Sequence, residues 1–104
     1  MLEAVTMAIK MSDGRSRIDL SDDPMLAMAL TRCLEILGEA ASRLSADLRL
    51  RLPGIPYAQM VSMRNRLIHA YFDVDLDIVW STVTEDLPAL LPVLDSALAP
   101  MQRD

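Results

Sequence analysis

The amino-acid sequence predicts an all-α fold, arranged as an antiparallel four-helix bundle. Hydrophobic types make up 52% of the 104 residues but aromatic ones only 4%, so leucine, alanine, methionine, valine and isoleucine dominate, which suits helix packing. Apolar residues recur at helical spacing, and no segment shows the sustained alternation of a strand. The length predicts one domain over residues 1–104, short enough that a second chain often completes the core.

The N-terminal part predicts a helix over residues 2–11, a loop over 12–20 and a long helix over 22–44. The long helix has a strong start signal in Ser21-Asp22-Asp23-Pro24, which offers a capping hydroxyl, two acids for the first turn and a proline that loses no hydrogen bond there.

Two apolar stripes run along the helix over residues 22–44, and together they form a face wider than one neighbouring helix needs. This excess predicts contact with a partner chain. One stripe consists of Ala29, Cys33, Ile36, Ala40 and Leu44, and the other of Leu26, Leu30, Leu34, Leu37 and Ala41.

The C-terminal half predicts a short turn or helix over residues 46–52, a helix over 57–70 and a last helix over 75–98. Pro88 and Pro92 each remove a backbone hydrogen bond, so we expect a kink or break in the last helix between residues 84 and 88. Inward-facing positions are predicted at Met60, Leu67, Ile68, Leu87, Leu90, Leu91, Leu94 and Leu98.

Cysteine content and the absence of targeting signals predict a soluble, cytoplasmic protein. Cys33 is the single cysteine, which indicates a reducing compartment and, inside an apolar run, a buried thiol. The N-terminus lacks the pattern of a signal peptide, and no apolar stretch approaches the length of about 18 residues that a membrane span needs.

Charge is unevenly distributed along a chain whose formal net charge is −5. Residues 43–66 carry five arginines against one aspartate, whereas residues 67–104 carry one arginine against seven acids. The net charge argues against bulk coating of nucleic acid, but the basic segment could hold a phosphate. Ordinary solvated charge is the alternative interpretation, and it applies equally to Glu39, which is spaced for an ion pair with Arg43 or for a position near a catalytic site.

The only histidine lies in Met63-Arg64-Asn65-Arg66-Leu67-Ile68-His69-Ala70-Tyr71. Asn65 is four residues before His69, so its amide can orient the imidazole ring, and Arg66 also lies nearby. Arg64 is about 140° around the helix from His69, so the two converge only if the arginine wraps round or a second chain contributes. Metal-free phosphodiester cleavage would use an imidazole as acid or base and arginines to bind the phosphate. A lone histidine near a helix end, however, is often a capping or packing residue.

The pattern Arg64-x4-His69-x-Tyr71 resembles the signature of the HEPN superfamily and is most similar to its HepT-like branch. Residues 34–41, residues 63–71, and residues 74–80 together with 84–88 all look like that family, and the likeness covers about residues 25–95.

That resemblance implies a helical-bundle homodimer whose two motifs face each other and cleave RNA without metal or cofactor. Arg64 and His69 would be catalytic, with Asn65, Arg66 and Glu39 in support. It also implies the toxin role in a prokaryotic toxin–antitoxin system. The partner would be a minimal nucleotidyltransferase antitoxin of the MntA type, which transfers AMP to the motif tyrosine, here Tyr71.

A different class of function stays open, namely a non-catalytic helical module that binds a nucleotide or the nucleotidyltransferase. The acidic net charge favours it, because no broad basic stripe follows the chain. Metal sites are not predicted: the acids at 73, 75 and 77 lack the glycine and glutamate that a calcium loop requires, and one histidine builds no usual zinc site.

Overall fold

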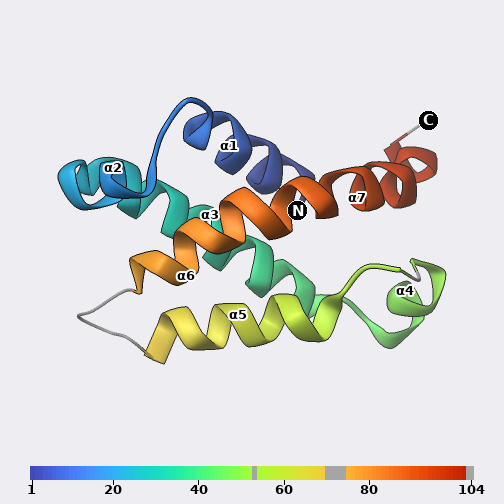
Figure 1. The fold of residues 1–104 in the computed structure, drawn as a ribbon. Helices are drawn as coiled ribbons and strands as arrows, with labels where there is room; N and C mark the ends of the chain where they lie inside the picture. The colour runs from blue at the N-terminus through green and yellow to red at the C-terminus, as the bar shows by residue number, and fades with distance from the viewer. Residues whose placement is uncertain (53, 70–74, 103–104) are drawn as a thin grey trace.

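The computed structural model describes residues 1–52, 54–69 and 75–102, and every regular element in these ranges is a helix, which confirms the all-α prediction. The four longest described elements are α1 (Leu2–Ser12), α3 (Pro24–Arg43), α5 (Tyr57–His69) and α7 (Leu87–Gln102) (Figure 1). Shorter helices connect them: α2 (Arg17–Asp22), α4 (Ala46–Arg51), α6 (Leu76–Ser81) and the π-helical segment η1 (Thr82–Asp86).

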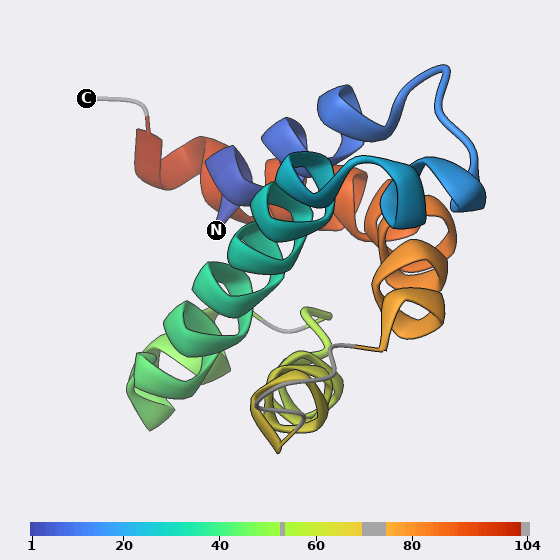
Figure 2. The same ribbon diagram turned by 90° about the vertical axis from the view of Figure 1, so that its left-hand side faces the viewer.

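Helix α3 is the central element, since α1, α2, α5 and α6 all pack against it. Helix α7 and η1 cover α1, which places α1 between two neighbours. Figure 2 looks along α5 and shows it set apart from the layer that α1 and α7 form. The largest fully buried side chains come from the central layer: Val5, Leu20, Leu30, Leu34, Leu37, Val79, Val83, Leu87 and Leu94.

The segment predicted as a loop over residues 12–20 instead contains the start of α2, so that prediction was wrong. A capping box begins this helix: the backbone N–H of Ser16 donates to the Asp19 carboxylate at 2.7 Å. The start of α3 also differs from the prediction, because Ser21 belongs to α2 and the cap is Asp23, whose carboxylate accepts from the Leu26 N–H at 3.2 Å. Short helices of this kind carry too little periodicity to be recognised, but Ser16-x-x-Asp19 is the local signal that could have found it.

The predicted irregularity near Pro88 is confirmed, and it takes the form of a π-helical segment rather than a break. The Leu87 N–H bonds to the carbonyl of Thr82, five residues back. Pro88 has no N–H to offer, so the wider turn before it accommodates the missing donor. The elements α6, η1 and α7 follow one another without interruption, and the helix changes direction between α6 and α7 (Figure 2).

The two stripes of α3 differ in burial. All five residues of the stripe from Leu26 to Ala41 are buried, as predicted. In the other stripe Cys33 is buried, but Ile36 is 40% exposed and Ala29, Ala40 and Leu44 are half-buried. One face of α3 is therefore left partly uncovered by the described residues. No helix in the described ranges has both the length and the apolar character needed to cross a membrane.

Candidate functional site

Helix α5 carries the motif, and its first turn is fixed by contacts with the preceding segment. The Tyr57 hydroxyl donates to the carbonyl of Leu52 at 3.0 Å, and burial raises the pKa of that hydroxyl, with the charge of Arg49 opposing the shift. The Arg49 guanidinium lies over the Tyr57 ring, 5.4 Å from its centre, and donates to the Ala41 carbonyl at the end of α3. These contacts tie the start of α5 to the end of α3.

Arg64 lies at a close contact between α5 and α3. The nearest residue across the contact is Gly38, and a Cβ built on Gly38 would overlap Arg64 Cβ and lie 3.0 Å from both Arg64 Cγ and the Met60 carbonyl oxygen. The aliphatic stem of the arginine therefore occupies the space that any other residue at position 38 would fill. Sequence reasoning did not assign Gly38 a role, although a glycine in the middle of a 20-residue helix was the available signal.

The guanidinium of Arg64 is partly held and partly available. Its Nη2 donates to the side-chain oxygen of Asn65 at 3.1 Å, whereas its Nε is buried and has no hydrogen-bond partner among the described residues. The amide of Asn65, predicted to orient the histidine ring, is thus engaged by Arg64 in this structure.

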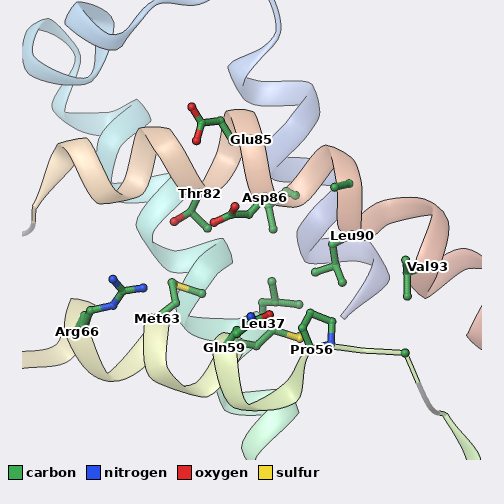
Figure 3. A pocket seen from close by; sticks show the side chains of 14 residues that line it. Leu37, Pro56, Gln59, Met63, Arg66, Thr82, Glu85, Asp86, Leu90 and Val93 are labelled. Atoms are coloured by element: carbon green, nitrogen blue, oxygen red, sulfur yellow. The ribbon is translucent and has the colours of Figure 1, made fainter.

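Arg66 lines a pocket of about 510 Å³ between α5 and the η1–α7 segment. Figure 3 shows Arg66 and Asp86 on opposite walls, and Glu85 also belongs to the η1 wall. The floor is apolar and includes Leu37, Met60, Met63, Leu87 and Leu90. The pocket thus places the Arg66 cation and the Asp86 carboxylate around an apolar floor on the flank of the motif helix, whereas the Glu85 carboxylate points away from it (Figure 3).

The other arginines of the basic segment have structural partners. Arg43 pairs with Glu39 at 2.7 Å and Arg51 pairs with Asp47 at 3.3 Å. Glu39 therefore makes the solvated ion pair that its spacing predicted, and within the described residues its carboxylate forms no hydrogen bond or ion pair with Arg64 or Arg66. Within the described ranges Arg64 and Arg66 form no ion pair, which leaves their charges available to an anion.

His69 is the last residue of α5, so its backbone follows Arg66 by one helical turn. The predictions for its imidazole, and those for Ile68 and Leu98 as inward-facing side chains, concern side chains that lie outside the described part of the structure, as does all of Tyr71. Met60 and Leu67 are buried as predicted, and so are Leu87, Leu90 and Leu94, whereas Leu91 is half-buried.

Cys33 is buried as predicted, and burial raises the pKa of its thiol. In the ranges that the structure describes, no cluster of three or more His, Cys, Asp or Glu residues could hold a metal ion. The described site therefore consists of the arginines and asparagine of α5, the glycine of α3 that faces them and the adjoining pocket.

Comparisons with known proteins give a consistent result. The sequence profile of the family described as "Ribonuclease HepT-like" matches residues 1–97. A protein of Thermococcus cleftensis named "Probable ribonuclease HepT" is 40% identical over 93 residues, which cover 86% of this chain and 84% of the relative. "Putative RNase MJ1380" of Methanocaldococcus jannaschii is 34% identical over 90 residues, covering 86% and 83%. "Putative RNase TTE0752" of Caldanaerobacter subterraneus is 36% identical over 90 residues, covering 86% and 80%. No solved structure matches.

Proposed function

This chain belongs to the HepT-like ribonuclease family and is a ribonuclease, and from that premise we propose that it is the toxin of a toxin–antitoxin pair, a metal-independent endoribonuclease with Arg64 and His69 as catalytic residues. The observation that best supports the site is the state of Arg64. Its stem is packed against α3 and its guanidinium has no ion pair within the described residues, which is the condition for binding a phosphate.

The proposed chemistry uses the 2′-hydroxyl of RNA as the nucleophile. His69 accepts the proton of that hydroxyl, and the 2′-oxygen attacks the adjacent phosphorus. The bond from phosphorus to the 5′-oxygen of the next nucleotide breaks, and this leaving oxygen takes up a proton from the protonated imidazole or from water. The guanidinium of Arg64 binds the phosphate and stabilises the charge that develops on its oxygens. The products are a 2′,3′-cyclic phosphate, which water can open to a 3′-phosphate, and a free 5′-hydroxyl.

The decisive experiment is cleavage of a labelled single-stranded RNA in the presence of EDTA. We expect wild-type protein to cut it, to spare the same oligonucleotide with deoxyribose, and to leave 2′,3′-cyclic or 3′-phosphate ends. Arg64→Ala and His69→Ala should each lose most of the rate, with His69→Ala retaining RNA binding, because its role lies in the transition state. Arg15→Ala, an exposed arginine outside α5, is the control. Full activity of His69→Ala, or activity that EDTA abolishes, would refute this mechanism.

The proposed enzyme is a homodimer in which two copies of the motif share one groove. The half-exposed stripe of α3 supports this arrangement, because Ile36, Ala29 and Ala40 are apolar residues without full cover in the described chain. A two-fold interface built on α3 and α5 would bring Arg64 of one copy towards His69 of the other.

Subunit mixing tests this arrangement directly. Inactive Arg64→Ala and inactive His69→Ala proteins, unfolded together and refolded, should form mixed dimers that regain activity if one site takes its arginine and histidine from different chains. Sedimentation that gives a monomer at micromolar concentration would exclude the shared groove.

We propose Tyr71 as the site of regulation by AMP transfer from a nucleotidyltransferase antitoxin. A phosphodiester two residues beyond His69 would place an anion near Arg64 and Arg66 and compete with the substrate phosphate. Intact-mass measurement after co-expression with the nucleotidyltransferase should show the mass of added AMP. Tyr71→Phe should stay unmodified and active, and an equally modified Tyr71→Phe would place the switch elsewhere.

A further inference from the structure

We propose that Gly38 is a positioning residue for the catalytic guanidinium of Arg64, an inference that rests on the function proposed above. Gly38 lies on α3, outside the Arg-x4-His-x-Tyr motif. Because glycine has no side chain, the stem of Arg64 can pack directly against the α3 backbone at this position. Its role would be to set the distance between the Arg64 stem and the α3 backbone. That distance determines where the guanidinium N–H groups lie and can donate to a phosphate.

The contact leaves no room for any larger residue. Arg64 Cβ occupies the volume that a Cβ at position 38 would take, and Arg64 Cγ and the Met60 carbonyl lie 3.0 Å from that position. The Met60 carbonyl belongs to the α5 backbone, which cannot turn aside as the end of a flexible side chain could. Rotation about χ1 moves Arg64 Cγ but not Cβ, so a methyl group here must push α5, and the Arg64 stem with it, away from α3.

The consequences for the guanidinium follow from its hydrogen bonds. The stem packed at Gly38 holds the Nε edge of the group in a buried position, and Asn65 accepts from Nη2 at 3.1 Å. Two points of fixation leave the remaining N–H groups with a preset direction, which is how an arginine binds a phosphate with little loss of side-chain entropy. A shift of the stem would change the depth of Nε and the direction of the free N–H groups together.

The location of the glycine supports a specific role, because a glycine in a helix interior is unfavourable in itself. Gly38 has no positive φ that would require glycine, unlike Gly14 and Gly54, so backbone conformation does not explain it. The close approach to Arg64 does.

The first test compares Gly38→Ala with the control Ala41→Gly. Ala41 is fully buried three residues further along α3, so its replacement by glycine weakens the same helix without adding a group opposite Arg64. In the RNA cleavage assay we expect Gly38→Ala to lower kcat by about tenfold to a hundredfold with little change in KM, since a misplaced charge is felt mainly in the transition state. Ala41→Gly should lower thermal stability and keep kcat within about twofold.

A double-mutant cycle separates positioning from general damage. In an Arg64→Gly background both the guanidinium and the Cβ that overlaps position 38 are gone, so adding Gly38→Ala should cost no further activity. If Gly38→Ala lowers the residual rate by the same factor in both backgrounds, Gly38 does not act through Arg64 and the inference fails. If Arg64→Ala is itself fully active, the proposed catalytic role of Arg64 fails instead, so the two failures are distinguishable.

A measurement on the unmodified protein covers the case in which Gly38→Ala does not fold. The Arg64 Nε–H should give a nitrogen-15 NMR signal that exchanges slowly with solvent, identified by its absence in Arg64→Lys. Rapid exchange, like that of the exposed Arg32, would show that the guanidinium is not seated against α3 and would overturn the proposal.

Discussion

Helices α1 and α5 both pack on α3, but they are covered to very different extents. Helix α1 also contacts η1 and α7, and its Ala4, Val5 and Ala8 are buried. For α5 the one extensive helix contact within the described residues is α3, and its flank towards η1 and α7 forms the wall of the pocket in Figure 3.

This difference separates structural from chemical roles. The sequence of α1 has no basic side chain apart from Lys10, whereas α5 places Arg64, Asn65 and Arg66 in consecutive positions. Consecutive residues on a helix point in directions about 100° apart, so the three can face α3, solvent and the pocket respectively only on a helix that is open on most sides. Attachment along a single face thus leaves Asn65 and Arg66 of the motif accessible within the described structure.

The largest expected effect is on stability, where Leu94→Ala should cost more than Met63→Ala. Leu94 is fully buried in α7, while Met63 in α5 is 5% exposed and borders the pocket. Loss of Leu94 leaves an enclosed cavity and should cost about 3–4 kcal/mol of unfolding free energy, but loss of Met63 widens an open pocket that water can enter, so about 2 kcal/mol is expected. Urea denaturation measures both, and equal costs would mean that α5 is as enclosed as α7.

A second expected difference concerns local opening. Amide hydrogens in the middle of α5 should exchange with deuterium at least about tenfold faster than those in the middle of α1, because fewer buried contacts must break to free α5. Exchange followed by mass spectrometry or NMR under native conditions gives this comparison within one sample. If a homodimer covers α5, dilution should increase its exchange and leave α1 unchanged.

The sequence predicted more of the fold than of the site, for a physical reason. Periodicity over ten or more residues located the helices that contain Val5, Leu34, Leu67 and Leu94, because burying one face of a long helix requires repeated apolar positions. The six-residue helix α2 was missed, since its cap at Ser16 is a local signal with one buried residue, Leu20.

For the site, the motif located the arginines but not their surroundings. Helical spacing placed Asn65 beside His69, but the side-chain oxygen of Asn65 accepts a hydrogen bond from Arg64. A helical-wheel projection does not predict this contact between adjacent residues. Gly38 and Arg64 face each other across two different helices, so no sequence pattern within one helix could predict their contact. Such contacts depend on how helices cross, which the tertiary fold decides.

High pH should weaken the fold through two groups, one in α3 and one in α5. Burial raises the pKa of the Cys33 thiol in α3 above 9.0 and that of the Tyr57 hydroxyl in α5 above 10.0. The unfolded chain then loses these protons at lower pH than the folded chain, so the stabilisation is complete below the unfolded values and disappears as pH rises through the folded ones. The melting temperature should fall above about pH 9, and Cys33→Ala should delay the fall to about pH 10, where the Tyr57 hydroxyl of the unfolded chain begins to ionise.

The smallest expected effect comes from Arg17, whose ion pair joins α2 to α6. Its Nε lies 2.7 Å from the Asp77 carboxylate and its Nη1 donates to Ser21 at 3.1 Å, but the two charged side chains are 37% and 82% exposed. Solvent screening limits such a pair to about 0.5 kcal/mol. Arg17→Ala should therefore lower the free energy of unfolding by that amount in low salt and by less in 1 M salt. Arg32→Ala is the matched control, because it breaks an exposed pair with Glu35 inside α3 alone. If Arg17→Ala still lowers the free energy of unfolding by more than about 1 kcal/mol in high salt, Arg17 holds α2 against α6 by packing of its aliphatic stem. The contact between α2 and α6 would then matter more for stability than the exposure of the ion pair indicates.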